Sequence, residues 1–187
     1  MHRTDFWGVF MFRFVALAFL SLSLLAACGG TTSTPTLGAD GKPLPQVYRI
    51  KAGSTGTIQF RMLDAVNVLR QAGSVTPVKL NSQLNAAAAT HARDMSVQNR
   101  AWHFGSDGSS PIERVARTGY PGILIGETIS ETFETELETL SAWMAQSNTR
   151  DVIMDPRATD LGFSWFQEPN GKIWWALVLG GAAANAS

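Results

Sequence analysis

Cysteine is nearly absent from this chain of 187 residues, which contains only Cys28. A single cysteine cannot form an intrachain disulfide, so a disulfide-stapled scaffold is excluded. Runs of lysine and arginine are also absent, and the formal net charge at pH 7 is zero. Both observations argue against nucleic acid as the main partner. No internal repeat is present, and a hydrophobic content of 45% is typical of one globular domain with a short accessory segment.

The one cysteine closes an apolar segment near the start of the chain. Arg13 precedes an uncharged run from Phe14 to Ala27, which Cys28 follows directly. This pattern predicts a secretory signal in residues 1–27, and its last residues, LAAC, resemble a bacterial lipoprotein signal. The run has about 14 residues, whereas a spanning helix needs roughly 20. The alternative, an uncleaved anchor over residues 6–27, would place Arg13 inside the bilayer.

We therefore predict cleavage before Cys28 and attachment of a lipid to its thiol, with Met1 or Met11 as the translation start. The lipid would hold the mature chain on a membrane of the cell envelope. Gly29 stands where an aspartate often marks inner-membrane retention. We therefore predict that, in a cell with an outer membrane, the protein is anchored to that membrane and faces the periplasm.

Composition divides the remaining chain into three parts. Residues 28–56 are rich in Gly, Ser, Thr and Pro, which predicts a tether, with a short edge strand at residues 47–50. Residues 57–181 are predicted to be the folded domain, and residues 182–187 a disordered tail.

Helical signals dominate the first half of the predicted domain. Apolar spacing predicts a helix from about residue 57 to Gly73, and a second from its cap at Asn81 to about residue 98. The second helix carries an apolar stripe that includes His91. Ser110, Pro111 and Glu113 form a capping-box pattern that predicts a third helix, ending at Gly119.

Strand signals dominate the second half. Residues 123–129 predict a strand, and residues from about 132 predict a helix with Phe133, Leu137, Leu140 and Met144 buried. Residues 161–167 and 172–179 flank an Asn-Gly turn and predict a hairpin. The second hairpin strand is apolar on both faces, so it should be central and covered by helices on each side. The predicted fold class is α/β, a three-layer α/β/α sandwich around a small, mainly antiparallel sheet.

Several motifs together resemble the CAP superfamily, also called SCP-like. They are LNAAAATHARDM at 84–95, HFGSDGSSPIER at 103–114, Gly119-Tyr120, GET at 126–128, Trp143, and the segment from Asp155-Pro156 to the Trp-rich last strand. The resemblance covers about residues 60–180 and is strongest to the bacterial, disulfide-free branch. It implies the same α/β/α sandwich, with a central cleft of up to two histidines and two acids that binds a divalent metal in some members.

The resemblance also implies a ligand-binding cleft at His103, Glu127 and Thr149. His103 matches the first cleft histidine and Glu127 matches the glutamate of the Gly-Glu-Asn motif, with Thr128 replacing the asparagine. The second histidine lies six residues after the motif tryptophan, a position held by Thr149. The second acid is replaced by Gln146, so two of four polar groups remain.

The remaining groups set limits on chemistry. A catalytic zinc site needs about three protein ligands, so His103 and Glu127 alone predict weak metal binding at best, and no cofactor is expected. His91 is predicted to be a core histidine that Asp94 can orient. No G-x-S-x-G nucleophile is present. General acid–base chemistry by His103 and Glu127 stays open, as does a structural role in which their hydrogen bond ties the loop at 105–110 to the sheet.

The sequence thus predicts a lipid-anchored, extracytoplasmic binding or interaction module more than an enzyme. Arg114 is expected to pair with an acid and brace the loop before it. The expected partners are the membrane, through Cys28, and a lipid or other envelope component. The alternative is a hydrolase, metal-assisted or not, that uses His103 and Glu127. The oligomeric state is left open.

Overall fold

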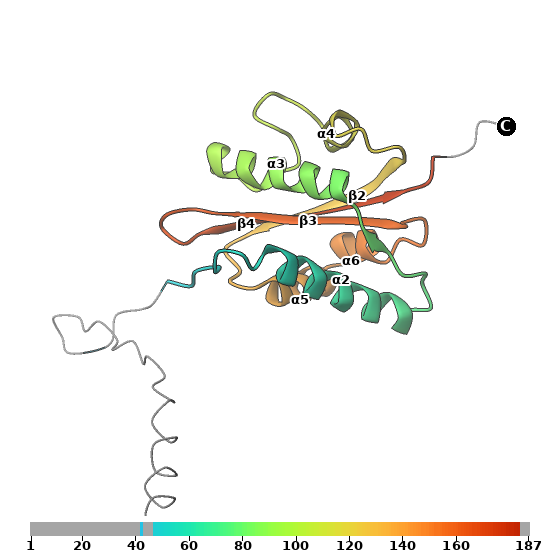
Figure 1. Cartoon of the computed structure of the whole chain (residues 1–187), viewed down its shortest axis with the longest axis horizontal. Helices are drawn as coiled ribbons and strands as arrows, with labels where there is room; N and C mark the ends of the chain where they lie inside the picture. The colour runs from blue at the N-terminus through green and yellow to red at the C-terminus, as the bar shows by residue number, and fades with distance from the viewer. Residues whose placement is uncertain (1–41, 43–46, 184–187) are drawn as a thin grey trace, which may run out of the picture. The chain divides into compact units, whose positions relative to one another are not determined.

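The structure is a computed structural model that describes residue 42 and residues 47–183 (Figure 1). The chain divides into two units, Met1–Gln46 and Val47–Ser187, and the account below concerns the second. The predicted signal peptide, Cys28 and nearly all of the tether before residue 47 lie outside the described residues. No helix in the described part of the chain combines the length and apolar character needed to cross a bilayer.

The two long helices form largely where the sequence predicts them. Helix α2 spans Thr55–Ala72 and helix α3 spans Ser82–Gln98. The Asn81 side chain accepts hydrogen bonds from the first-turn N–H groups of α3, which confirms its role as N-cap. The predicted stripe of α3 is completely buried: Leu84, Ala88, His91 and Met95.

Helix α4, Pro111–Arg117, begins at the predicted capping box. The Ser110 hydroxyl accepts from the Glu113 N–H, and the Glu113 carboxylate accepts from the Ser110 N–H. These reciprocal bonds satisfy donors at the helix start and fix where α4 leaves the preceding loop. The box therefore also fixes the position of Arg114, the next residue.

Four strands form one sheet in the order β1-β3-β4-β2. Their bounds are Lys79–Leu80 for β1, Ile123–Glu131 for β2, Asp160–Gln167 for β3 and Ile173–Gly181 for β4. Strand β4 pairs antiparallel with both neighbours and is buried along its whole length, which confirms that it is central. Only β1 pairs in parallel, with β3, and it lies in the segment between the first two predicted helices.

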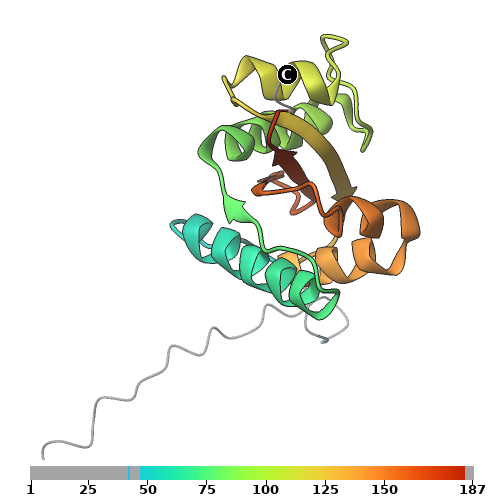
Figure 2. The same ribbon diagram turned by 90° about the vertical axis from the view of Figure 1, so that its right-hand side faces the viewer.

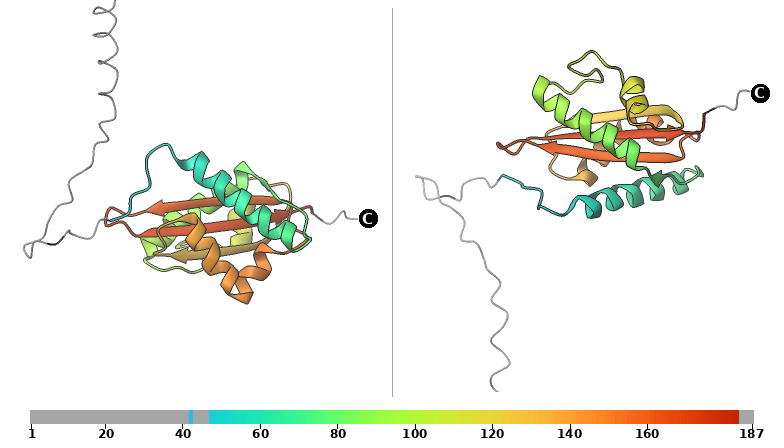
Figure 3. Two further views of the ribbon diagram at one scale, coloured as in Figure 1. Left: turned by 90° about the horizontal axis from the view of Figure 1, so that it is seen from below. Right: turned by 45° about the horizontal axis from the view of Figure 1, so that its top comes forward.

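Helices cover both faces of this sheet. Helices α3 and α4 lie above it in Figure 1, and below it lie α2, α5 (Glu136–Ala145) and α6 (Ser147–Ile153). Figures 2 and 3 show the same three layers from the end and from beneath. The two faces have separate apolar cores, one around Phe163 and Trp175 and one around Met95 and Trp174. The predicted α/β/α sandwich is confirmed.

Two local predictions are wrong. The helix expected from residue 132 begins later: α5 spans Glu136–Ala145 because Thr135 and Glu138 form a second capping box. As a result, Phe133 and Leu137 are exposed, and Trp143 is buried beside Leu140. The chain then starts a separate helix, α6, at Ser147–Ile153.

The predicted edge strand at residues 47–50 is also wrong. This segment has no regular structure and lies along the β3–β4 hairpin. The Ile50 N–H donates to the side chain of Gln167 at 3.0 Å, and not to a main-chain carbonyl as it would in a β-strand. Arg49 donates to the carbonyls of Glu168 and Pro169 in the hairpin turn.

Candidate functional site

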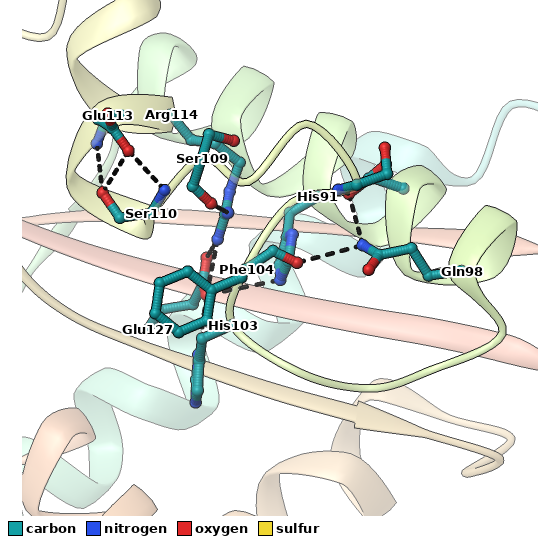
Figure 4. A network of polar contacts seen from close by, with 11 residues as sticks. His91, Gln98, His103, Phe104, Ser109, Ser110, Glu113, Arg114 and Glu127 are labelled. Atoms are coloured by element: carbon teal, nitrogen blue, oxygen red, sulfur yellow. Dashed lines mark hydrogen bonds and ion pairs between the residues drawn. The ribbon is translucent and has the colours of Figure 1, made fainter.

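The centre of the candidate site is a buried carboxylate. Glu127 lies on β2, and its side chain is only 3% exposed. An ionised carboxylate removed from water is costly unless other groups neutralise it and donate hydrogen bonds to it. Three side chains from three other segments surround Glu127 (Figure 4).

The first partner is Arg114 on α4. Its Nη2 donates to both oxygens of Glu127 at 2.9 Å, and its Nη1 donates to the Ser109 carbonyl at 3.2 Å. The arginine is itself 5% exposed. The prediction that Arg114 pairs with an acid is confirmed, and the acid is Glu127. The same guanidinium joins the loop before α4 to the sheet.

The second partner is His103, which approaches from the loop after α3. Its Nδ1 lies 2.9 Å from Glu127 Oε1, so the structure brings the two predicted site residues together. The histidine side chain is 50% exposed, in contrast to every other group on this carboxylate. With Nδ1–H donating to Glu127, Nε2 of a neutral His103 is the atom left to meet a ligand.

The loop that carries His103 is fixed to α3 by polar bonds. Asp94 accepts from the Ser106 N–H at 2.7 Å and from its hydroxyl at 2.5 Å. Gln98 donates to both Asp94 and the Phe104 carbonyl. Asp94 therefore holds the loop, and the prediction that it orients His91 is not supported by a hydrogen bond between them.

The third neighbour of Glu127 is His91 on α3. The histidine is 0% exposed, as a core residue should be, yet its Nε2 lies 3.6 Å from Glu127 Oε1. Neither ring nitrogen is in hydrogen-bond geometry with a described group. Burial lowers the pKa of His91, and Arg114 adds to this effect, while Glu127 opposes it. His91 therefore belongs to the Glu127 cluster in its neutral form.

The surroundings also shift the acidity of Glu127. Burial raises its pKa, but the hydrogen bond from His103 and the positive charge of Arg114 outweigh burial. The pKa of Glu127 therefore stays below the usual glutamate value, and the carboxylate is ionised near neutral pH.

Thr149 takes a different role from the other two predicted cleft residues. It lies in the first turn of α6, where its hydroxyl donates to the carbonyls of Trp143 and Gln146. In the described part of the chain, no hydrogen bond or ion pair connects Thr149 to Glu127 or His103. The Thr149 hydroxyl thus joins α5 to α6. The residues that surround Glu127 together with His103 are instead Arg114 and His91.

The cluster does not fit a catalytic zinc site. Among residues 47–183, no group of three or more His, Cys, Asp or Glu side chains is placed to hold a metal ion. Glu127 is the carboxylate shared by both histidines, but both of its oxygens already hold the Arg114 guanidinium. A metal at that carboxylate would face the repulsion of a fixed positive charge.

Two cavities lie on opposite faces of the sheet. One, of about 380 Å³, borders this cluster, because Arg114 lines it together with polar groups that include Asp94, Ser106 and Arg117. The other, of about 440 Å³, is an apolar groove between α2 and α5 on the opposite face of the sheet. Val68 and Leu137 form part of its wall.

Sequence comparison places these features in a known group. Residues 63–179 match the model of the cysteine-rich secretory protein family, CAP. The chain is 24% identical over 127 residues to the uncharacterized protein YkwD of Bacillus subtilis, covering 68% of this chain and 49% of the relative. The chain therefore spans about half the length of the curated relative that it matches.

Solved structures share the fold at low identity. An outer surface protein of Borrelia burgdorferi superposes with a TM-score of 0.64 at 13% identity, covering 71% of this chain and 98% of that one. An extracellular protein with an SCP domain from Bacillus anthracis superposes with a TM-score of 0.60 at 18% identity, covering 78% and 45%. The arrangement of helices around the sheet is thus common to these proteins.

Proposed function

Because this chain belongs to the cysteine-rich secretory protein family, we propose that it is an extracytoplasmic binding module anchored by a lipid on Cys28. The proposed ligand is a lipid or another component of the cell envelope, and the proposed contact surface is centred on His103. Two similar proteins support an envelope location, since one is an outer surface protein and the other is extracellular. An outer membrane, facing the periplasm, is the proposed site in a cell that has one.

The burial of the paired Glu127 carboxylate, 3% exposed, is the observation that supports binding without catalysis. A general base or metal ligand must offer a free lone pair to its substrate or metal. Both Glu127 oxygens accept from Arg114, Oε1 also meets His103, and burial keeps the remaining lone pair of Oε2 away from solvent. The carboxylate therefore serves to fix His103, whose exposed ring edge is available to a ligand.

A hydrolase is the alternative, favoured by one specific contact. The 2.9 Å bond from His103 Nδ1 to Glu127 orients the ring and leaves Nε2 to accept a proton from water. No serine, threonine or cysteine hydroxyl or thiol among the described residues is hydrogen-bonded to His103. Under this alternative, the attacking group would be water itself.

Ligand capture separates the two functions. The mature chain with Cys28→Ser, secreted in a bacterial host, is analysed by native mass spectrometry and in parallel for hydrolysis of ester and amide substrates. We expect an envelope molecule bound to this protein and to the matched control Lys79→Ala, with roughly tenfold weaker binding in His103→Ala, about 1.4 kcal/mol.

Three outcomes would contradict the proposal. Turnover that disappears in His103→Ala, with unfolding unchanged, would favour the hydrolase. A ligand lost from Val68→Glu/Leu137→Glu but kept in His103→Ala would move the binding site to the apolar groove. For the anchor, a Cys28→Ser protein that still fractionates as a processed lipoprotein would refute the lipid attachment.

A further inference from the structure

We propose that one end of the domain is built to lie against anionic lipid headgroups. This hairpin end consists of residues 47–51, the last turns of α3 with the residues after it at 93–102, and the β3–β4 turn at 168–172. All three segments lie at the left of Figure 1, far from the end where the C-terminus leaves the sheet. The proposal extends the proposed function, because it says how an anchored domain would face its membrane.

Five basic residues meet at the hairpin end, although the sequence contains no basic run. They are Arg49, Lys51, Arg93, Arg100 and Lys172. Hydrogen bonds place their segments together: Arg49 donates to carbonyls of the hairpin turn, and Lys172 donates to Asn99, the neighbour of Arg100, at 3.3 Å. The fold therefore assembles a positive surface from segments that are far apart in the chain.

Most of this charge is not neutralised within the domain. In residues 47–183, Lys172 pairs with Glu131, but Lys51, Arg93 and Arg100 form no ion pair. The other acids close to this end are Asp94, Glu134 and Glu168. The Asp94 carboxylate accepts from Gln98 and Ser106, and Glu168 accepts from the Trp174 indole at 2.7 Å. Five cations against four carboxylates leave a small positive excess at this end, which anionic headgroups would attract.

Aromatic rings hold three of these cations at the surface. Arg93 lies 5.1 Å from the Phe166 ring centre, Arg100 lies 4.1 Å from Trp102, and Lys172 lies 3.8 Å from Trp174. These are the cation–π pairs of the described chain, and all lie at the hairpin end. Stacking orders a cation without cancelling its charge, so a headgroup phosphate would meet a preformed surface.

Apolar side chains are exposed between the charges. Val47 is 53% exposed, Val97 75%, Phe104 48% and Phe133 38%. Phe133 is close to this end, because the N–H of Thr132 before it donates to Ile173, the first residue after the hairpin turn, and its own carbonyl accepts from Trp175. Basic residues mixed with exposed aromatic and aliphatic side chains fit a membrane interface better than a fully solvated polyanion.

The point where the chain enters the domain lies at the hairpin end. Val47 is the first residue of the second unit and lies against Gly171 of the hairpin turn. If Cys28 carries a lipid, the 19 peptide units from Cys28 to Val47 can span at most about 65 Å. The anchor therefore limits how far the hairpin end can move from the bilayer, whatever path those residues take.

Vesicle binding by a protein without its lipid tests the surface separately from the anchor. The mature chain with Cys28→Ser is mixed with phosphatidylcholine vesicles, with or without phosphatidylglycerol, and sedimented. The test variant is Lys51→Gln/Arg93→Gln/Arg100→Gln. The matched control, Lys79→Gln/Arg150→Gln/Arg157→Gln, removes three exposed basic residues from outside the hairpin end.

We expect binding to the anionic vesicles that salt weakens and that the control variant keeps. The test variant should bind at least tenfold more weakly, since each basic residue near such a surface contributes roughly fivefold. Hydrogen exchange on the vesicles should slow at residues 93–104 and 168–172. Thermal unfolding of both variants confirms that each is folded.

Three results would overturn the proposal. They are no binding of the parent to anionic vesicles at low salt, an equal loss in both variants, and binding to a soluble polyanion such as heparin but not to vesicles. The last result would assign the surface to an anionic polymer. Failure of lipid attachment at Cys28 would leave these vesicle results unchanged, so the two proposals can fail separately.

Discussion

Two arginines are buried on opposite faces of the sheet, and they are held in different ways. Arg70 on α2 is 0% exposed and donates only to main-chain carbonyls, those of Thr76, Ile153, Asp155 and Ala158. Arg114 on α4 is 5% exposed and donates mainly to the carboxylate of Glu127. The first joins loops together, and the second fixes a polar cluster that reaches solvent at His103.

The different hydrogen-bond acceptors of the two arginines show that Arg70 stabilises the fold, whereas Arg114 is part of the candidate site. Carbonyl acceptors carry no net charge, and burial lowers the pKa of Arg70, with the Asp155 carboxylate opposing this effect. Such an arginine stabilises the chain path from α6 to β3 and offers nothing to a ligand. Arg114 instead neutralises a carboxylate that also holds an exposed histidine. Burial alone would not distinguish them, whereas their acceptors do.

The largest expected effect is the loss of Arg70. Arg70→Met removes four hydrogen bonds and leaves buried carbonyls without a donor, so we expect a loss of about 4 kcal/mol in the free energy of unfolding. Urea denaturation of the two proteins measures this loss. Arg70→Lys, which keeps the charge but offers fewer directed donors, should recover only part of it. A loss below about 1 kcal/mol would contradict the structural role.

Removal of Arg114 should cost slightly less and, unlike the loss of Arg70, should be reversible by a second change. Arg114→Met leaves Glu127 buried without its cation, at a cost of about 3 kcal/mol. Glu127→Gln in the same chain removes the uncompensated charge, so the double variant should regain more than half of the loss. Asp155→Asn provides the control, because it should not rescue Arg70→Met. Additive effects for Arg114 and Glu127 would show that the pair is not coupled.

On the face of the sheet that α3 and α4 cover, much of the arrangement could be predicted from the sequence. The cap at Asn81 and the capping box at Ser110 predicted the helix starts that carry His91 and Arg114, and both were confirmed. Local signals of this kind depend on a few neighbouring residues. The pairing of His103 with Glu127 came from the family resemblance, which adds long-range information that spacing alone does not contain.

The opposite face was harder to predict. Phe133 and Leu137 were expected in the core because apolar spacing alone does not show where a helix begins, and the Thr135 cap shifted its start. Arg70 has no sequence signal, since its acceptors are backbone carbonyls from distant segments. The membership of His91 in the cluster was missed because a residue on the buried stripe of a helix can still face a buried charge on the sheet that the helix covers.

The smallest effect, and the one most specific to the Glu127 cluster, concerns pH. Burial lowers the pKa of His91 in the folded chain below its unfolded value of roughly 6.5. As pH falls through that value, the unfolded chain takes up a proton that the folded chain does not, so stability falls. Between pH 7 and 5, His91→Gln should therefore flatten the decline in unfolding free energy, by at most about 1.4 kcal/mol per pH unit.

The depressed pKa of Glu127 acts at lower pH, below roughly 4.5, and adds little in this window. An unchanged slope in His91→Gln would show that this histidine takes up its proton equally in both states. The difference between the two arginines would then rest on Glu127 and His103 alone.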